Sequence, residues 1–358
     1  MRRLLVLAAA AAVVCSAAAS AAPDAITGRY LLSFLACDPS GGRQCNDPRN
    51  HRVYLAQSDD GAAWSLVPGW QPYAGSVPDV FRRGDTVYVY TPRFVARYRL
   101  STGTLEQPVA VQVTGLDSAG FVDPSVIQDA DGRLVLFFLP GVQGRDPASC
   151  LPDENPCVKR FRSATEVAGS DGTRFTLDDG VRAEYTIPDG IPSSDPDVFK
   201  AGSTYVLYVT HGETIVPYTS PTLRGSYSQG APLNDRTGGI PSGYFDAASG
   251  RFWTYAHVRV GGRQVIRRAV HADLVHPLTE SDWTTVLTGA GVGLGSRVDV
   301  ESPGFAVDEP GIALATQSAG SDSGGTSPSA KKKAATAKKR PLCRKGQRST
   351  KKKPCRKR

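Results

Sequence analysis

Residues 194–211 read SDPDVFKAGSTYVLYVTH, and this stretch decides the fold because its pattern recurs along the chain. Residues 198–199 begin an extended segment, and residues 200–203 have the composition of a turn. Residues 205–209 form an almost continuous apolar run, as expected for a strand buried on both faces. The stretch therefore predicts a β-hairpin that follows an Asp-Pro-Asp sequence and ends in a histidine.

Four further segments repeat this strand–turn–strand pattern, and each is led by a proline: residues 76–91, 121–138, 240–257 and 301–315. The spacing of the copies is irregular but always leaves room for four strands. A fixed inner hairpin with variable outer strands is typical of a β-propeller. The strands predicted at 29–35 and 53–57 have no inner hairpin of their own, so we expect the two ends of the folded region to pair and complete one blade. The sequence thus predicts an all-β, five-bladed propeller over residues 22–317.

The segments outside the propeller have other compositions. Residues 1–21 resemble a signal peptide, with Arg2 and Arg3 ahead of an apolar run that is too short to span a bilayer. Residues 318–330 are a Ser/Gly-rich linker, and residues 331–358 form a Lys/Arg-rich tail that cannot bury a core. We therefore expect a secreted or cell-surface protein, and a monomer.

Six of the seven cysteines lie beyond the signal peptide in three close pairs: Cys37 with Cys45, Cys150 with Cys157, and Cys343 with Cys355. Locally spaced pairs behind a signal peptide predict three loop-closing disulfides. No pair has the spacing of a zinc knuckle, so neither a metal nor a cofactor is expected.

The net charge of +8 hides a segregation of charge. The tail contains 15 basic residues and the signal peptide contains two, which leaves 25 of the 42 basic residues for the body. Against the 34 acidic residues of the chain, this gives the body a net charge of about −9. Two interpretations of the tail stay open: a solvated extension, or adhesion to an anionic cell-envelope polymer or acidic polysaccharide. Nucleic acid is not an expected partner of a secreted chain.

Carboxylates lead the repeated inner strands and should converge on one face of a propeller: Asp79, Asp123, Asp195, Asp197 and Glu301. The returning strands should bring His211 and His257 to the same rim. Cleavage of a glycosidic bond needs one carboxylic acid to protonate the leaving oxygen and one carboxylate to activate water or attack. Poly- or oligosaccharide is therefore the expected partner.

Four short motifs carry a resemblance to a known family: DPS at 123–125, DPDVF at 195–199, SDDGAAW at 58–64 and SPTLRGSY at 220–227. They resemble motifs of the five-bladed glycoside hydrolases of family 43, which include arabinanases, xylosidases and arabinofuranosidases. The resemblance implies inversion by an Asp base, a Glu acid and a second Asp that tunes the acid. One register makes Asp123 the base and Glu301 the acid, with Ile240 in the blade where the tuning Asp belongs. The other register starts at Asp79 or in the N-terminal blade and supplies no Glu acid.

Structural roles compete with these assignments. Aspartates beside a turn often accept backbone N–H groups, which applies to Asp79 and Asp197 most directly and to Asp123 and Asp195 as well. Glu301 could be a solvated rim residue, and the two histidines could be hydrogen-bonded rim residues. The rival function is a non-catalytic propeller that binds glycan or the cell surface.

Overall fold

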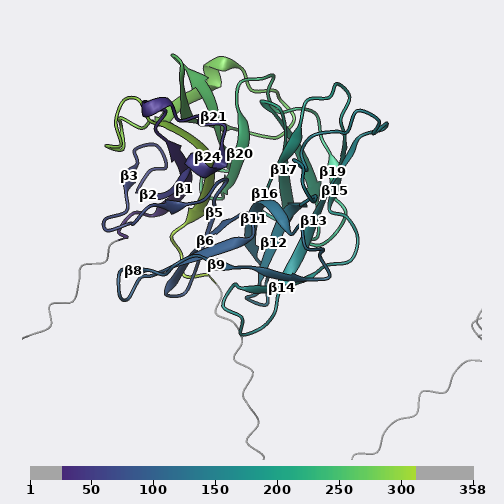
Figure 1. Cartoon of the computed structure of the whole chain (residues 1–358), viewed down its shortest axis with the longest axis horizontal. Helices are drawn as coiled ribbons and strands as arrows, with labels where there is room; N and C mark the ends of the chain where they lie inside the picture. The colour runs from purple at the N-terminus through teal and green to yellow at the C-terminus, as the bar shows by residue number, and fades with distance from the viewer. Residues whose placement is uncertain (1–25, 312–358) are drawn as a thin grey trace, which may run out of the picture. The chain divides into compact units, whose positions relative to one another are not determined.

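Four of the five predicted inner hairpins form antiparallel strand pairs in the computed structural model, which describes residues 26–311. Five sheets surround a common axis, and Figure 1 shows β24 at the C-terminal end of the colour scale beside β1 at the N-terminal end. The strand expected within 312–315 and the segments predicted on either side of the propeller lie outside the described residues.

Each sheet is one blade of the propeller, with its strands given from the axis outward. Blade 1 contains β5 (Asp79–Arg83), β6 (Thr86–Thr91), β7 (Phe94–Arg99), β8 (Thr104–Leu105) and β9 (Val109–Ala110). Blade 2 contains β11 (Phe121–Gln128), β12 (Leu134–Pro140), β13 (Val158–Glu166), β14 (Arg174–Leu177), β10 (Gln112–Thr114) and β15 (Ala183–Thr186). Blade 3 contains β16 (Ser193–Ala201), β17 (Thr204–His211), β18 (Thr214–Ser220) and β19 (Ser228–Gln229).

The last two blades complete the ring. Blade 4 contains β20 (Gly239–Asp246), β21 (Arg251–Val260), β22 (Arg263–His271) and β23 (Trp283–Leu287). Blade 5 contains β24 (Asp299–Val307), β1 (Tyr30–Cys37), β2 (Arg52–Ser58), β3 (Ser65–Leu66) and β4 (Tyr73–Ala74). The antiparallel pairing of β1 with β24 confirms the predicted closure of the propeller by its two ends.

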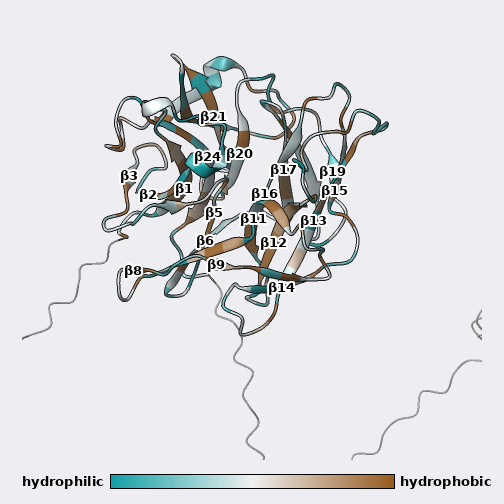
Figure 2. Ribbon diagram, in the orientation of Figure 1, coloured by the Kyte–Doolittle hydropathy of each residue, from teal (hydrophilic) through white to brown (hydrophobic). Residues whose placement is uncertain are grey.

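The hydrophobic core is divided into five parts, and each part lies between two neighbouring blades. The cluster around Phe137 and Leu207, for example, joins blades 2 and 3, and the cluster around Leu31 and Val87 joins blades 5 and 1. Central strands such as β12 and β17 are therefore buried on both faces, which explains their continuous apolar runs. Figure 2 shows this apolar character along β11 and β12.

The residue before each repeated proline has an unusual backbone conformation. All five have positive φ: Val77 (43°), Asp123 (49°), Asp195 (51°), Ile240 (46°) and Ser302 (53°). Residues before proline normally stay extended, and β-branched residues rarely adopt the left-handed region. The strand register shifts at this point in blades 2 to 5, which is the mark of a β-bulge.

The residue after each proline ties its blade to the next one. Four of these side chains accept a backbone N–H from the neighbouring inner strand, at 2.6, 3.0, 2.8 and 3.0 Å. In order, the acceptors are Asp79, Ser125, Asp197 and Ser242, and the donors are Val126, Val198, Gly243 and Phe305. We call these four bonds the inter-blade belt.

The fifth junction, between blades 5 and 1, is closed differently. Gly304 occupies the equivalent position, and a Cβ there would lie 2.6 Å from the Cα of Asp79. The hydroxyl of Ser33 instead donates to the carbonyl of Pro78 at 3.2 Å. The close approach of the two inner strands therefore requires a glycine at residue 304.

Disulfides close loops between neighbouring strands of two blades. The predicted bonds of Cys37 with Cys45 and of Cys150 with Cys157 are both present. The third predicted bond would join Cys343 and Cys355. Because Cys343 and Cys355 both lie outside the described residues, 26–311, this bond stays a prediction.

The turn at 58–64 is structural. The Asp60 carboxylate accepts the N–H groups of Ala62 and Ala63, at 2.8 and 2.9 Å, and thereby fixes the backbone between β2 and β3. The helices between residues 26 and 311 are single 3₁₀ turns, and none of them could cross a membrane.

We expect Asp197→Ala to reduce the free energy of unfolding by about 1–3 kcal/mol, because it leaves a buried backbone N–H and the Ser242 hydroxyl without their acceptor. Asp197→Asn keeps an acceptor and should cost less. Burial raises the pKa of Asp197 to about 7, so the folded state retains a proton that the unfolded chain releases near pH 4. Stability should therefore fall as pH rises from about 4 to 7, and this loss should be smaller in Asp197→Asn.

Urea unfolding of the wild type and both variants at pH 5 and pH 8 measures these effects. Equal stability of Asp197→Ala and the wild type at both pH values would contradict a structural role for the belt.

Candidate active site

The five residues before the prolines meet at one end of the axis, which we call the proline end. The cavity between them has a volume of about 20 Å³, enough for about one water molecule. Four aspartates line it, Asp79, Asp123, Asp195 and Asp197, together with Val77, Ile240 and Ser302. The propeller thus brings four of the five predicted carboxylates to the border of one small cavity.

Asp123 and Asp195 form a pair across blades 2 and 3. The backbone N–H of Asp195 donates to the Asp123 carboxylate, and the Ser194 hydroxyl donates to the Asp195 carboxylate. Desolvation, followed by the charge of Asp195, raises the pKa of Asp123 well above its usual range. Desolvation and the charge of Asp146 raise the pKa of Asp195 to about 6. Burial thus favours the protonated form of both carboxyl groups, and a charge on Asp195 opposes the ionisation of Asp123.

Glu301 lies one residue before Ser302, at the start of the inner strand of blade 5. Its side chain is partly buried, and among residues 26–311 its carboxyl group has no hydrogen-bond partner. Burial and the nearby charge of Asp299 raise the pKa of Glu301 to about 7, while Arg259 acts in the opposite direction. An unpartnered carboxyl group that is protonated at neutral pH has the properties of a general acid.

The two rim histidines have different surroundings. His257 Nδ1 accepts the backbone N–H of Ser302 at 3.1 Å, and desolvation lowers the pKa of this histidine to about 4. It is therefore neutral, with its proton on Nε2. His211 is on blade 3, and its Nε2 lies 2.9 Å from Asp189 Oδ1. Both histidines lie on the predicted rim, where β17 and β21 pair with the first residues of β16 and β20.

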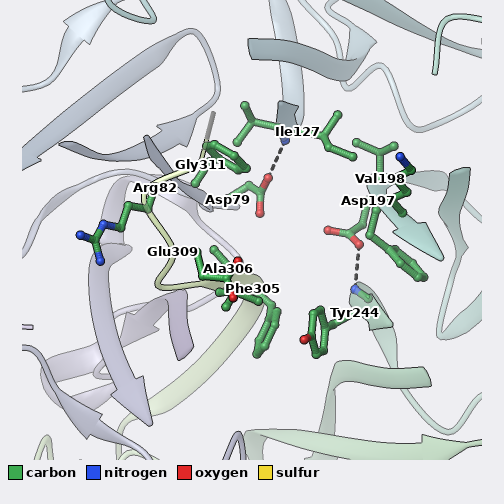
Figure 3. A pocket seen from close by; sticks show the side chains of 16 residues that line it. Asp79, Arg82, Ile127, Asp197, Val198, Tyr244, Phe305, Ala306, Glu309 and Gly311 are labelled. Atoms are coloured by element: carbon green, nitrogen blue, oxygen red, sulfur yellow. Dashed lines mark hydrogen bonds between the residues drawn. The ribbon is translucent and has the colours of Figure 1, made fainter. Parts of the chain in front are cut away.

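Asp79 and Asp197 border a second cavity as well. They are buried in the inter-blade belt, between the cavity at the proline end and one of about 260 Å³ toward the far end of the axis. Figure 3 shows their carboxyl groups directed into this cavity from blades 1 and 3. Aromatic side chains form much of the remaining wall: Phe81, Phe199, Tyr244 and Phe305. These two aspartates thus lie between the two cavities, with belt hydrogen bonds that Asp123 and Asp195 do not make.

Two charged residues near the candidate site do not belong to any of the motifs identified in the sequence. Asp299 precedes Glu301 by two residues on the same strand and accepts the backbone N–H of Gln264 at 3.1 Å. Asp146 lies in a loop of blade 2, and its charge acts on both members of the aspartate pair. Asp299 could have been found from its position in the fifth repeat, whereas Asp146 lies outside the repeated pattern.

The proline end contains no group suited to bind a metal tightly. Between residues 26 and 311, no three His, Cys, Asp or Glu side chains are arranged to hold a metal ion. The available chemistry is proton transfer by carboxyl groups: Glu301, with a raised pKa, and the pair of Asp123 and Asp195.

No family model and no curated protein matches this sequence. Several solved glycoside hydrolases are similar to it in structure, at low sequence identity. A family 43 enzyme from Xanthomonas citri in complex with xylotriose is 18% identical, with 69% of this chain and 89% of that chain covered and a TM-score of 0.46. An endo-1,4-β-xylanase from Bacteroides thetaiotaomicron is 15% identical, with 73% and 91% covered and a TM-score of 0.45.

An α-L-arabinofuranosidase from Clostridium thermocellum is 14% identical, with 68% of this chain and 87% of that chain covered and a TM-score of 0.44. The chain thus resembles family 43 glycoside hydrolases in structure, as its motifs predicted. The likeness concerns the fold.

We expect Asp299→Asn to lower the pKa of Glu301, because it removes the neighbouring negative charge. Arg259→Gln should raise the same pKa by a smaller amount, since this arginine is exposed and screened by solvent. NMR titration of the Glu301 carboxyl carbon measures both shifts without any assumption about activity. Shifts in the same direction in the two variants would contradict the electrostatic origin of the raised pKa.

Proposed function

We propose that this protein is a secreted glycoside hydrolase that cleaves polysaccharide with the carboxylates of the proline end. Glu301 is the general acid, and Asp123, which is paired with Asp195, is the general base. The observation that carries this proposal is an unpartnered Glu301, whose pKa is raised to about 7, at the same end of the axis as an aspartate pair in which the pKa of Asp195 is raised to about 6.

In the proposed reaction, Glu301 gives its proton to the oxygen of the leaving sugar. The aspartate pair takes a proton from a water molecule, whose oxygen attacks the anomeric carbon from the opposite face of the sugar. The anomeric configuration is inverted, and solvent returns the two carboxyl groups to their initial protonation states. Asp299 serves as the tuning carboxylate in place of the one that Ile240 does not supply.

Export from the cytoplasm is part of the proposal. Two disulfides favour an oxidising compartment, and the signal-peptide character of residues 1–21 points the same way. Adhesion of the basic tail to an anionic envelope polymer would keep the protein near its substrate.

A non-catalytic, glycan-binding propeller is the second candidate function. Two observations favour it: the apolar Ile240 stands where a third carboxylate was expected, and the cavity of about 20 Å³ at the proline end has no room for a sugar ring. In that case Glu301 and the aspartate pair would contribute only to binding.

We expect Glu301→Gln to reduce kcat/KM on xylan or arabinan by about 10²–10⁴-fold, because the leaving oxygen loses its proton donor. Nitrophenyl xylosides and arabinofuranosides have good leaving groups and should be affected much less. Asp123→Asn should impair both kinds of substrate. Glu309→Gln, an exposed residue at the far end, is the matched control and should behave like the wild type. If the wild type and Glu301→Gln are equally inert on all these substrates, the hydrolase proposal fails.

The pH dependence of kcat/KM should be bell-shaped. Activity should rise up to pH about 6, as the aspartate pair becomes ionised, and fall above pH about 7, as Glu301 loses its proton. Initial rates between pH 4 and 9 measure both limits. A descending limb that does not move in Asp299→Asn would contradict the assignment of Glu301 as the acid.

A further inference from the structure

A second cavity on blade 5 lies close to the candidate acid. It has a volume of about 500 Å³ and is lined by the end of β1, the start of β2 and residues that precede β24. Ala36, in its wall, pairs with Val300, the residue before Glu301. The cavity is therefore placed to receive a part of a glycan that also reaches Glu301.

Two arginines of this cavity have no acidic partner in the described part of the chain. Arg52 donates only to the carbonyls of His51 and Arg49, at 2.8 and 3.4 Å. Arg43 also lines the cavity and makes no ion pair between residues 26 and 311. Because the body of the protein carries about −9, two guanidinium groups in one cavity that make no ion pair among the described residues stand out from their surroundings.

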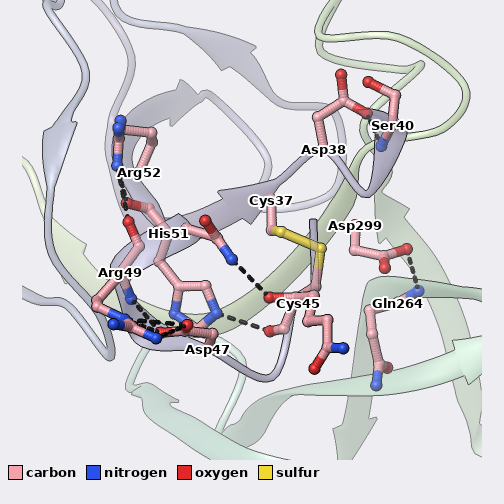
Figure 4. Close-up of a disulfide and its surroundings, with 12 residues drawn as sticks. Cys37, Asp38, Ser40, Cys45, Asp47, Arg49, His51, Arg52, Gln264 and Asp299 are labelled. Carbon is pink, nitrogen blue, oxygen red and sulfur yellow. Dashed lines mark hydrogen bonds and ion pairs between the residues drawn. A yellow bond between two sulfur atoms is a disulfide. The ribbon is translucent and has the colours of Figure 1, made fainter. Parts of the chain in front are cut away.

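The wall that carries these arginines is rigidly held. The Cys37–Cys45 disulfide closes the loop of Arg43, and His51 bridges the Cys45 carbonyl at 2.8 Å and the Ser76 hydroxyl at 2.9 Å. Figure 4 shows the disulfide, His51 and Arg52 in this wall. A site with a fixed wall loses little entropy when a ligand binds.

The other lining residues suit a sugar. Tyr54 is stacked on Phe34 at 5.6 Å between ring centroids and is partly buried, so its orientation is fixed. Asn50 donates an amide N–H to the Gln44 carbonyl at 3.0 Å, and its amide oxygen can accept from hydroxyl groups. Asp38 accepts the backbone N–H of Ser40 at 2.9 Å and keeps acceptor capacity for sugar hydroxyls, although its charge also offsets part of that of the arginines.

We propose that this cavity binds a carboxylate-bearing sugar, so that the protein acts on an acidic polysaccharide. Arg43 and Arg52 bind the carboxylate, because a planar guanidinium matches it with two parallel hydrogen bonds. Asp38, Asn50 and Tyr54 contact the hydroxyls and the ring. The inference rests on the proposed function in taking a glycan as the substrate, and it specifies the charge of that glycan.

Affinity electrophoresis of the full chain tests the proposal at about 0.15 M salt, a concentration that screens exposed charges beyond roughly 8 Å. The gels contain native glucuronoxylan or polygalacturonate, or the same polymers after reduction of their carboxyl groups. The double variant Arg43→Gln/Arg52→Gln is compared with Arg49→Gln/Arg160→Gln, in which the same number of exposed arginines is lost. Those two control arginines are ion-paired with Asp47 and Glu184 and do not line the cavity.

We expect the wild type and the control variant to bind at least one native polymer about tenfold more tightly than its reduced form, a difference that the cavity variant loses. Equal retention of the cavity and control variants would overturn the proposal and assign acidic-polymer binding to other charges, such as the tail. Equal retention on native and reduced polymers, or no retention on any of them, would also overturn it.

The outcome is separable from that of the hydrolase proposal. Retention that depends on the two arginines, without hydrolysis by the wild type, would sustain the cavity and overturn the enzyme. Hydrolysis of neutral polysaccharide without any preference for the native acidic polymers would sustain the enzyme and overturn the cavity.

Discussion

The inter-blade belt is the interaction on which the rest of the molecule depends. A propeller has no single core, and here five separate apolar clusters each join only two blades. The belt adds directional hydrogen bonds between the inner strands, nearest the axis, to the non-directional packing of these clusters. It uses a short acceptor side chain after four of the five prolines, and in blades 2 to 4 a bulge lies at this point of the strand.

The same bulge determines which carboxylates remain available for chemistry. A residue after the proline is used by the belt, as Asp197 is by the Gly243 N–H. A residue before the proline is directed to the axis, where Asp123 and Asp195 meet. One local backbone feature therefore produces both the fixed ring of strands and the charged proline end. Glu301 lies one residue earlier in the chain than Ser302, and it neither serves the belt nor lines the small cavity. Among the described residues its carboxyl group has no hydrogen-bond partner.

Much of the fold could be predicted because the repeat consists of residue types with characteristic backbone conformations. Proline, the turn glycines and the buried apolar runs occur five times in one order, and only a closed ring of similar blades uses that order five times. The closure by residues 29–35 was predictable from the same repeat, since the strands at 29–35 and 53–57 had no inner hairpin of their own. The candidate site was less predictable: the four aspartates of the repeats look alike in sequence, and Asp146 and the cavity of Arg43 and Arg52 lie outside any repeat.

The sequence by itself determined the number of blades, the pairing of the two ends and the cysteine pairs that close two loops, because these follow from local spacing along the chain. Only the tertiary structure decided which aspartates serve the belt and which meet at the axis. It also decided that Asp299 raises the pKa of Glu301 and that two arginines of different segments share one cavity. These properties depend on desolvation and on distances between residues of different segments, and neither is encoded in the order of residues within one repeat.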